Sequence, residues 1–213
     1  MGEIDVPAYE IVGSGDRLAV VLHGYGGCKE EILGLAADVA CRGFDTLAID
    51  LRGHGASTEP FGRAILDDVV ELVAGRKRRY RGIAAIGHSL GGRIALLSGA
   101  DLAIAISPPL RQELSDSTRR TLKTLRGSRV DESGGEDPST ILTDLPTGID
   151  RFCPFSLIWA ESDFPEIRED CSRLVDDGHE GRMIGGAFHG DVHLHPRTFA
   201  IAGEILERWA SGI

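Results

Sequence analysis

The sequence lacks the apolar stretches that would place it in a membrane. None of its apolar runs approaches the ~20 residues that a membrane-spanning helix needs. Met1 to Glu10 is of mixed polarity, with neither the basic segment nor the apolar segment of a secretory signal. We therefore expect no signal peptide and no integral membrane segment.

Positive charge is also scarce. The chain has 23 Lys and Arg against 33 Asp and Glu, which gives a formal net charge of −10. Nucleic acids and anionic membranes are bound by basic patches, so we expect neither as a partner. The one dense basic run is Arg76 to Arg79 with Arg81. It falls between an expected helix and an expected strand, which is typical of a helix C-terminus and a solvated loop.

Cysteines are few, and none forms a Cys-x-x-Cys pair. The four are Cys28, Cys41, Cys153 and Cys171, which we expect to be reduced thiols in a cytoplasmic protein. The sequence also has no internal repeat and no long low-complexity tract. A length of 213 residues with 42% hydrophobic and 26% charged residues is typical of a single globular domain.

What the sequence does contain is a regular alternation of apolar runs and amphipathic segments. The runs expected to be strands are 8–12, 18–22, 44–49, 83–87, 102–106, 154–159 and 181–184. The segments expected to be helices are 30–41, 63–74, 89–99, 165–177 and 196–210. This alternation predicts an α/β fold with a mostly parallel central sheet and helices on both faces. In such sheets, ligands bind beyond the carboxyl ends of the strands.

The alternation breaks between the fifth and sixth expected strands. Residues 110–151 instead contain one short helix expected after Ser115 or Ser117 and another expected to begin at Asp137-Pro138. We interpret 110–151 as a small lid inserted over the ligand-binding edge of the sheet, within a single domain, 1–213. A linker to a second domain is the alternative, but the chain lacks the length for that domain.

Gly87-His88-Ser89-Leu90-Gly91 lies where an expected strand meets an expected helix. Glycines two residues before and after Ser89 remove the Cβ clashes of a sharp strand-to-helix turn, which leaves the hydroxyl exposed at its tip. The helix N-terminus at this point favours developing negative charge. The pattern indicates a nucleophilic serine, with a glycine-rich turn that carries no chemistry as the alternative.

A nucleophilic serine needs a base, and the base needs an orienting group. Histidine is the usual base because its pKa lies near the operating pH. Asp163 follows one expected strand and His189 follows the next, so the chain order is Ser, Asp, His. Glu161 and His193 are the alternatives for the acid and the base.

Two other chemistries would use different residues. His189, His193 and His195, helped by Asp191, could form a metal cluster, but we expect His193 and His195 to lie in a solvated loop. Cys28 is expected to be a buried thiol, because a serine already fills the nucleophile position.

Four segments, in order and at fitting intervals, resemble the α/β-hydrolase family over nearly the whole chain. They are the HGxG-type oxyanion loop His23 to Gly26, the D-x-R-G-H-G-x-S loop Asp50 to Ser57, the nucleophile elbow Gly87 to Gly92, and the histidine loop Gly186 to His189 with Pro196 after it. The resemblance implies the α/β-hydrolase fold. We expect Arg52 and His54 to stabilise a tight loop beside the cleft, with substrate contact as the alternative.

The resemblance also implies a role for each residue of the site. Ser89 attacks the acyl carbon, His189 takes and later delivers the proton, and Asp163 orients the imidazole. The backbone N–H groups of Tyr25 and Leu90 bind the oxyanion. The family's spacing favours these residues over the neighbouring carboxylate and histidine. No cofactor is needed, since side chains, backbone N–H groups and water carry out the chemistry.

These features predict a serine hydrolase of small or medium acyl esters, a carboxylesterase or lipase-like enzyme. The D-x-R-G-H-G-x-S loop and the small lid also resemble monoacylglycerol lipase and lysophospholipase-like members. Serine at the elbow excludes the family's haloalkane and epoxide hydrolases, which use Asp, and its dienelactone-type hydrolases, which use Cys. A thioesterase, a serine peptidase or a weakly hydrolytic ligand-binding receptor are the alternatives. The expected partner is a small-molecule acyl substrate. Neither the identity of this substrate nor the oligomeric state of the protein has a signature in the sequence.

Overall fold

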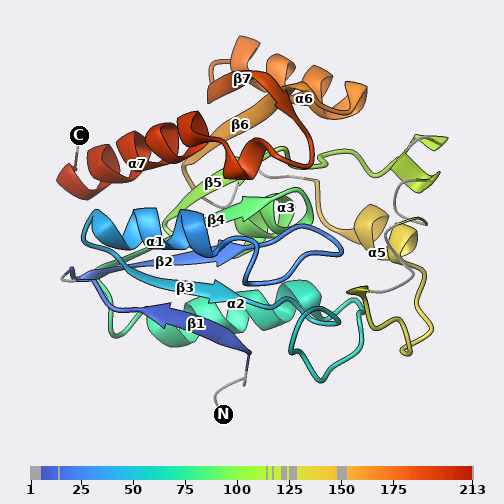
Figure 1. The fold of residues 1–213 in the computed structure, drawn as a ribbon, viewed down its shortest axis with the longest axis horizontal. Helices are drawn as coiled ribbons and strands as arrows, with labels where there is room; N and C mark the ends of the chain where they lie inside the picture. Colours follow the sequence, from blue (N-terminus) through green and yellow to red (C-terminus); the bar gives the residue numbers. More distant parts are fainter. Residues whose placement is uncertain are drawn as a thin grey trace.

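A seven-stranded sheet forms the centre of the protein (Figure 1). The computed structural model describes residues 6–13, 15–113, 115–116, 118–120, 124, 129–147 and 153–212. The strands lie in the order β1-β3-β2-β4-β5-β6-β7. Only β1 is antiparallel to its neighbour, so the predicted mostly parallel sheet is confirmed. The strands are β1 (Ala8–Ile11), β2 (Arg17–Leu22), β3 (Asp45–Ile49), β4 (Gly82–His88), β5 (Leu102–Ile106), β6 (Phe155–Ser162) and β7 (Glu180–Phe188).

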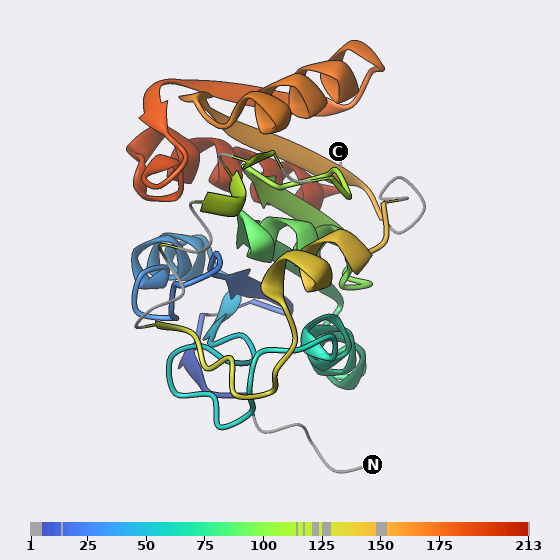
Figure 2. The ribbon, with the colours of Figure 1, turned by 90° about the vertical axis from the view of Figure 1, so that its right-hand side faces the viewer.

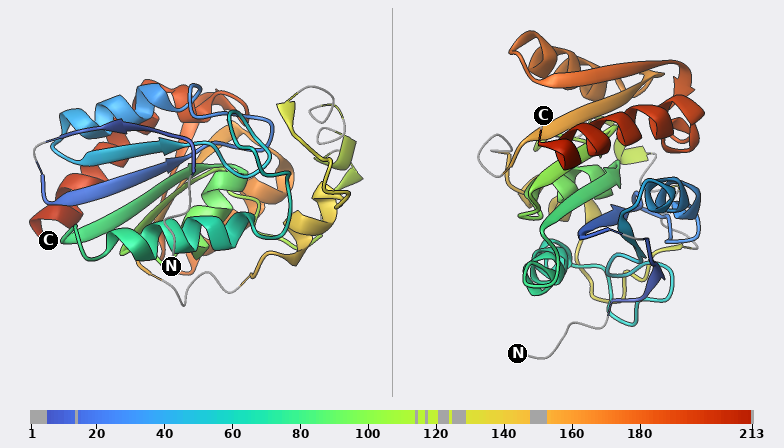
Figure 3. Two further views of the ribbon diagram at one scale, coloured as in Figure 1. Left: turned by 90° about the horizontal axis from the view of Figure 1, so that it is seen from below. Right: turned by 90° about the vertical axis from the view of Figure 1, so that its left-hand side faces the viewer.

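Helices cover both faces of the sheet, as the alternation predicts (Figure 3). The side chains of α1 and α7 pack on one face, and those of α2, α3 and α6 pack on the other. The helices are α1 (Leu33–Cys41), α2 (Ile65–Arg76), α3 (Leu90–Leu97), α5 (Pro138–Asp144), α6 (Pro165–Asp176) and α7 (Pro196–Ser211), with a 3-10 turn η2 (Val192–Leu194) before α7.

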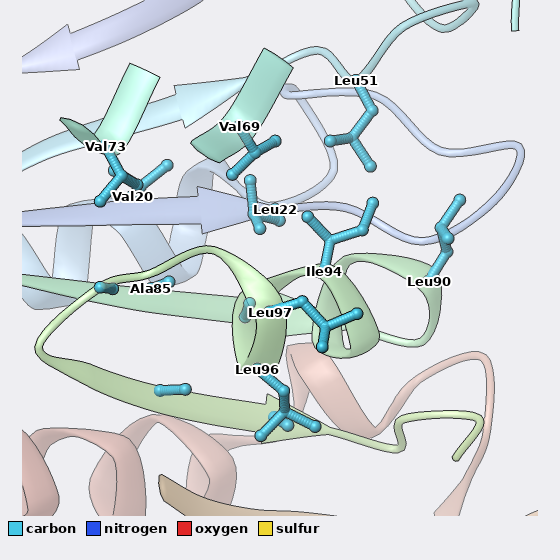
Figure 4. Close-up of a cluster of buried hydrophobic side chains, with 14 of the residues drawn as sticks. Val20, Leu22, Leu51, Val69, Val73, Ala85, Leu90, Ile94, Leu96 and Leu97 are labelled. Carbon is cyan, nitrogen blue, oxygen red and sulfur yellow. The ribbon is translucent and has the colours of Figure 1, made fainter. Parts of the chain in front are cut away.

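The continuous apolar strands are buried on both faces. In β2, Val20 and Leu22 face the core beneath α2 and α3, whereas Val21 faces the core beneath α1 and α7. Figure 4 shows the first of these cores, where Val20 and Leu22 meet Val69 of α2 and Ile94 of α3. Burying each such side chain contributes about 1.5–3 kcal/mol, which is why the run carries no polar residue at alternate positions.

The last strand is longer than the predicted 181–184. β7 continues to Phe188, which pairs with Ser162 after an irregularity in the ladder between Ala160 and Ser162. Gly186 lies in this stretch with a φ of 78°, a conformation that glycine adopts without steric cost. The Gly-Gly pair therefore bends the strand rather than ending it.

The loops that follow the parallel strands meet at one edge of the sheet, which faces the viewer in Figure 2. The second half of the inserted segment packs onto this edge. Val130 forms a bridge with His54. The N–H of Phe61 donates to the carbonyl of Asp131 at 2.7 Å, and the N–H of Asp131 donates to the carbonyl of Gly53 at 2.8 Å. The insertion is thus hydrogen-bonded to the D-x-R-G-H-G-x-S loop.

A buried arginine ties the two ends of the insertion to α3. Arg93 is only 1% exposed, and its guanidinium donates to the carbonyls of Pro109, Leu145 and Pro146 at 2.6, 2.7 and 2.8 Å. Burial lowers the pKa of Arg93 to about 10, so the group stays charged at neutral pH. Three carbonyl dipoles compensate the buried charge where a carboxylate partner would otherwise be needed.

The predicted helix start at Asp137 is confirmed. The carboxylate of Asp137 accepts the N–H of Ser139 at 2.8 Å and caps α5. The helix expected after Ser115 or Ser117 falls partly outside the described residues, as do residues 114, 117, 121–123, 125–128 and 148–151 of the insertion. Among the described residues, the Ser115 hydroxyl accepts the N–H of Thr118 at 3.2 Å.

Removing the buried carboxylate of Asp50 is expected to be costly. Its carboxylate is fully buried and accepts the backbone N–H groups of Lys29 and Ala56, both at 2.8 Å, and the Lys29 ammonium at 2.5 Å. Asp50→Ala leaves the ammonium without its buried partner, so the free energy of unfolding should fall by about 3–5 kcal/mol in urea titrations. Glu30→Gln removes the exposed partner of the same lysine and should have a much smaller effect. Equal losses in both variants would contradict the importance of burial.

Candidate active site

Ser89 lies at the tip of the turn between β4 and α3, in strained backbone. Its φ is 51° and ψ is −115°, and its N–H donates to the carbonyl of Ile106 at 2.8 Å. A Cβ on Gly87 would lie 2.1 Å from the carbonyl oxygen of Gly91, and a Cβ on Gly91 would lie 2.5 Å from that of His23. Both flanking glycines are therefore required by sterics, which is the reason inferred from the sequence.

The structure brings Ser89, His189 and Asp163 together from the ends of three strands. His189 Nε2 lies 3.1 Å from Ser89 Oγ, and His189 Nδ1 lies 2.7 Å from Asp163 Oδ1. A carboxylate only accepts hydrogen bonds, so the Nδ1–H donates to Asp163, and in the neutral ring the bare Nε2 accepts the serine hydroxyl. This is the tautomer in which an imidazole can take a proton from serine.

Asp163 is held as a carboxylate by several donors. Oδ1 also accepts the N–H of Phe164 at 2.9 Å, and Oδ2 accepts the N–H of Ala160 at 3.1 Å and the hydroxyl of Ser107. Burial works to raise the pKa of Asp163, but the bonds from His189, Ser107 and Ala160 outweigh it and leave the pKa below its usual value. The group is therefore ionised across the neutral range.

A pocket of about 220 Å³ opens onto Ser89. Tyr25, Leu90, His189 and the serine line one side of it. Leu90 is the first residue of α3, so its N–H has no acceptor within the helix. Apolar side chains line much of the rest: Pro109, Leu110, Leu142, Phe164 and Ile167. Charged side chains are also part of the wall: Glu31, Arg111, Glu113, Arg129, Glu166 and Asp170.

The Tyr25 side chain fastens the oxyanion loop to the insertion. Its ring packs edge-on against His54 and Phe61, with centroids 5.5 and 5.3 Å apart, and its hydroxyl donates to Glu132 at 2.5 Å. Arg129 forms an ion pair with Glu31 at 2.7 Å beside the same loop. The insertion thereby helps to set the position of the Tyr25 backbone.

The alternative residues for the acid and the base make other contacts. Glu161 is exposed and accepts the N–H of Gly186 at 2.8 Å, away from the imidazole. The expectation that His193 and His195 lie in a solvated loop is wrong for His193, which is only 8% exposed because it stacks on His88. His195 is half-buried and caps α7, with its Nδ1 accepting the N–H of Arg197. In the described part of the chain, no group of three or more His, Cys, Asp or Glu is arranged to hold a metal ion.

The side chains of the D-x-R-G-H-G-x-S loop hold the loop itself. Arg52 donates two hydrogen bonds to Asp68, at 2.7 and 2.9 Å, and His54 is buried with its Nδ1 against the carbonyl of Arg52. Neither side chain lines the pocket. Cys28 is half-buried rather than buried as expected, and burial raises the pKa of its thiol. That shift disfavours the nucleophilic thiolate.

Ser107 is a residue of the site that sequence reasoning missed. It follows β5 with a φ of 49°, its N–H donates to the carbonyl of Ile158 at 2.7 Å, and its hydroxyl donates to Asp163. Its position could have indicated this role, because Ser107 directly follows β5, whose carboxyl end lies beside the elbow. Its side-chain partner, 56 residues away, is set only by the pairing of β5 with β6.

Loss of the Ser107 hydroxyl should weaken the support of Asp163. A hydrogen bond to a charged group is worth about 1.5–3 kcal/mol, so Ser107→Ala should lower the free energy of unfolding by that amount in denaturant titrations. Ser107→Gly also loses the bond but relieves the positive φ, and should be the more stable of the two variants. If alanine were as stable as serine, the bond to Asp163 would contribute nothing.

A search of the chain against known families matches a model described as "Alpha/beta hydrolase family" over residues 19–154. That segment is more than half of the chain and includes the oxyanion loop and the elbow. The chain belongs to the alpha/beta hydrolase family. No sequence among the curated proteins matches it.

Solved structures agree with this alpha/beta hydrolase in fold. A structure from a study of carboxylesterases of Nitrososphaera gargenis has a TM-score of 0.72 at 17% identity, covering 98% of this chain and 96% of that one. A thermophilic esterase from Thermogutta terrifontis gives 0.71 at 18% identity, with 95% and 93% covered. A monoacylglycerol lipase from Paleococcus ferrophilus gives 0.65 at 17% identity, with 97% and 98% covered. At these identities the likeness establishes the α/β-hydrolase fold.

Proposed function

We propose that this alpha/beta hydrolase is a serine esterase that cleaves carboxylic esters of small or medium acyl chains through an acyl-enzyme. The observation that carries the proposal is the hydrogen-bonded chain from Ser89 through His189 to Asp163, with distances of 3.1 and 2.7 Å, at the wall of a pocket. A pocket of about 220 Å³ with a partly apolar lining fits a small acyl group. The esterases and the monoacylglycerol lipase among its structural neighbours support the same class of substrate.

In the proposed reaction, Ser89 Oγ attacks the acyl carbon while its proton passes to His189 Nε2. The oxyanion accepts hydrogen bonds from the backbone N–H groups of Tyr25 and Leu90. His189 then donates the proton to the leaving alcohol, which gives the acyl-enzyme. A water molecule then attacks the acyl carbon of the acyl-enzyme while His189 takes its proton. The proton returns to Ser89 Oγ as the carboxylic acid is released. Asp163 stabilises the imidazolium and remains a carboxylate.

We further propose that residues 110–151 act as a small lid and that the protein is cytoplasmic. The first proposal is supported by the insertion's contribution to the pocket wall, which includes Leu110, Arg111 and Leu142. The second is supported by four free cysteines. No helix among the described residues is long and apolar enough to span a membrane.

A fluorophosphonate probe tests the nucleophile. The probe phosphonylates an activated serine, so we expect the native protein to be labelled and Ser89→Ala to remain unlabelled. Ser98→Ala is the matched control, because Ser98 lies at the other end of α3 and should leave labelling intact. Absence of labelling in the native protein, or equal labelling of Ser89→Ala, would contradict the proposal that Ser89 is the nucleophile of a serine esterase.

A series of p-nitrophenyl esters of graded acyl length tests the substrate class. We expect kcat/KM to be highest for short and medium chains and to fall for long ones, because the pocket is small. A maximum at long chains would point to a lipase. A flat profile near zero in a protein that still takes the probe would point instead to a thioesterase, a serine peptidase or a weakly hydrolytic receptor.

A further inference from the structure

His88, the residue before the nucleophile, makes a defined hydrogen bond to the loop of the base. Its side chain is buried at the end of β4, and its Nε2 lies 2.8 Å from the backbone carbonyl oxygen of His189. A carbonyl oxygen can only accept, so this Nε2 must carry the proton. If the ring is neutral, its Nδ1 is therefore the bare nitrogen.

The same imidazole touches two further parts of the site. It stacks on the ring of His193, with centroids 4.1 Å apart and an interplanar angle of 21°. A Cβ on Gly24 of the oxyanion loop would lie 3.0 Å from His88 Nδ1, so the His88 ring is in close contact with that loop. His88 is thus joined covalently to Ser89, hydrogen-bonded to the base loop and packed against the oxyanion loop.

The surroundings of His88 favour the neutral ring. Burial lowers its pKa well below the ordinary value, and the neighbouring His193, His189 and His23 lower it further, while the bond to the His189 carbonyl opposes them. Burial likewise lowers the pKa of His193 to about 4, with His189 adding to the effect and Asp191 opposing it. Two neutral rings can stack closely, whereas two cations could not.

The base loop, residues 188–191, lies at the edge of the sheet. β7 is the edge strand of the sheet, its pairing with β6 is irregular near the end, and Phe188 is 60% exposed. Phe188 and Asp191 close the turn with local hydrogen bonds at 2.7 and 3.2 Å. The bond from His88 links this turn to the central strand that carries the nucleophile.

We propose that His88 is a positioning residue that, as a neutral imidazole protonated on Nε2, holds the His189 backbone in register with Ser89 and the oxyanion loop. The inference rests on the proposed esterase function, since it assigns a task within that site. A displacement of about 1 Å in a reacting group can cost 10²-fold in rate, so a fixed backbone matters for the 3.1 Å contact between Ser89 and His189.

Two variants of His88 distinguish the effect of its hydrogen bond to the His189 carbonyl from the effect of the packing of its ring. In His88→Gln the side-chain amide reaches the place of Nε2 and can donate to the same carbonyl, whereas His88→Phe keeps a stacking ring without the donor. We expect His88→Phe to lower kcat for p-nitrophenyl esters by about 10- to 100-fold with little change in KM, because the defect lies in alignment rather than binding. His88→Gln should recover most of the loss.

His179→Phe is the matched control. His179 stacks on Phe155 with centroids 4.7 Å apart, and it precedes β7 at the opposite end of the strand from His189. This variant should retain native kcat and KM. Native turnover by His88→Phe, or equal losses in His88→Gln and His88→Phe at temperatures where both are folded, would overturn the proposal.

Nitrogen-15 NMR of the resting protein tests the same idea without substrate. We expect His88 to show a protonated Nε2 and a bare Nδ1 between about pH 6 and 8, the range in which histidines ordinarily titrate. The downfield Nδ1–H signal of His189 should persist in His88→Gln and broaden in His88→Phe. The opposite tautomer, a cationic His88, or an unchanged His189 signal in His88→Phe would reject the anchoring role. If a fluorophosphonate did not label the native protein, the proposed esterase function would be rejected. The spectra would still test separately whether His88 holds the His189 backbone.

Discussion

Replacing Ser89 by alanine is expected to lower kcat for ester hydrolysis by about 10⁴- to 10⁶-fold, the largest effect of any single substitution in this protein. The variant keeps the pocket and the two proposed oxyanion donors but has no hydroxyl oxygen to form the proposed acyl-enzyme. The strained backbone at φ 51° also carries over to alanine, so the turn should keep its shape. The measurement is kcat with a p-nitrophenyl ester, together with thermal melting to show that the fold is intact.

A double variant shows whether Ser89 and His189 act as one unit. Once the serine is absent, the imidazole has no proton to take, so Ser89→Ala with His189→Ala should be no slower than Ser89→Ala alone. Multiplicative losses in the double variant would mean that His189 acts on something other than the serine. Activity close to native in Ser89→Ala would place the nucleophile elsewhere.

Asp163→Asn is expected to lower kcat by about 10³- to 10⁴-fold at neutral pH, the second largest effect. Asp163 is surrounded by donors: His189 and Phe164 donate to one oxygen, and Ala160 and Ser107 donate to the other. An amide has only one oxygen, so its NH₂ must face one of these pairs. If the NH₂ faces the imidazole, Nδ1 becomes the acceptor and Nε2 carries the proton, which prevents it from taking the proton of Ser89.

If the NH₂ faces the other pair instead, it meets the Ala160 N–H, and the uncompensated donors destabilise the buried amide. Either orientation is therefore unfavourable, which distinguishes this site from an exposed aspartate. Glu161→Gln is the matched control, because Glu161 is the neighbouring carboxylate and accepts the Gly186 N–H rather than a bond from the imidazole in the described part of the chain. We expect it to keep native kcat. A loss in Glu161→Gln with none in Asp163→Asn would make Glu161 the orienting acid.

The elbow shows how far local sequence reasoning extends. The requirement for glycine at positions 87 and 91 follows from the steric limits of a strand-to-helix turn, and the structure has Cβ positions there that would overlap backbone. The alternation of strands and helices likewise follows from local periodicity, so the parallel sheet and its helices could be predicted. Element ends were less predictable, since β7 continues through Gly186 by pairing with Ser162 of another strand.

The partners of the elbow depend on contacts that no local pattern contains. His193 and His189 are four residues apart and both follow the last strand, yet only His189 lies beside Ser89, while His193 is buried against His88. Ser107 and Asp163 are distant in sequence and meet because β5 pairs with β6. The insertion offered no motif, but its Glu132 bonds the tyrosine of the oxyanion loop.

By itself, the sequence predicted the fold class, the sharp turn at Ser89 and the order of Ser89, Asp163 and His189 at successive strand ends. These features depend on steric limits and apolar periodicity within short stretches of about ten residues. Such local properties do not require knowledge of tertiary contacts. The tertiary structure alone decided where His193 is buried, which side chains support Asp163 and what lines the pocket. Those outcomes depend on the order and register in which strands distant in sequence pair, because a side chain at a strand end meets only what the neighbouring strands bring there.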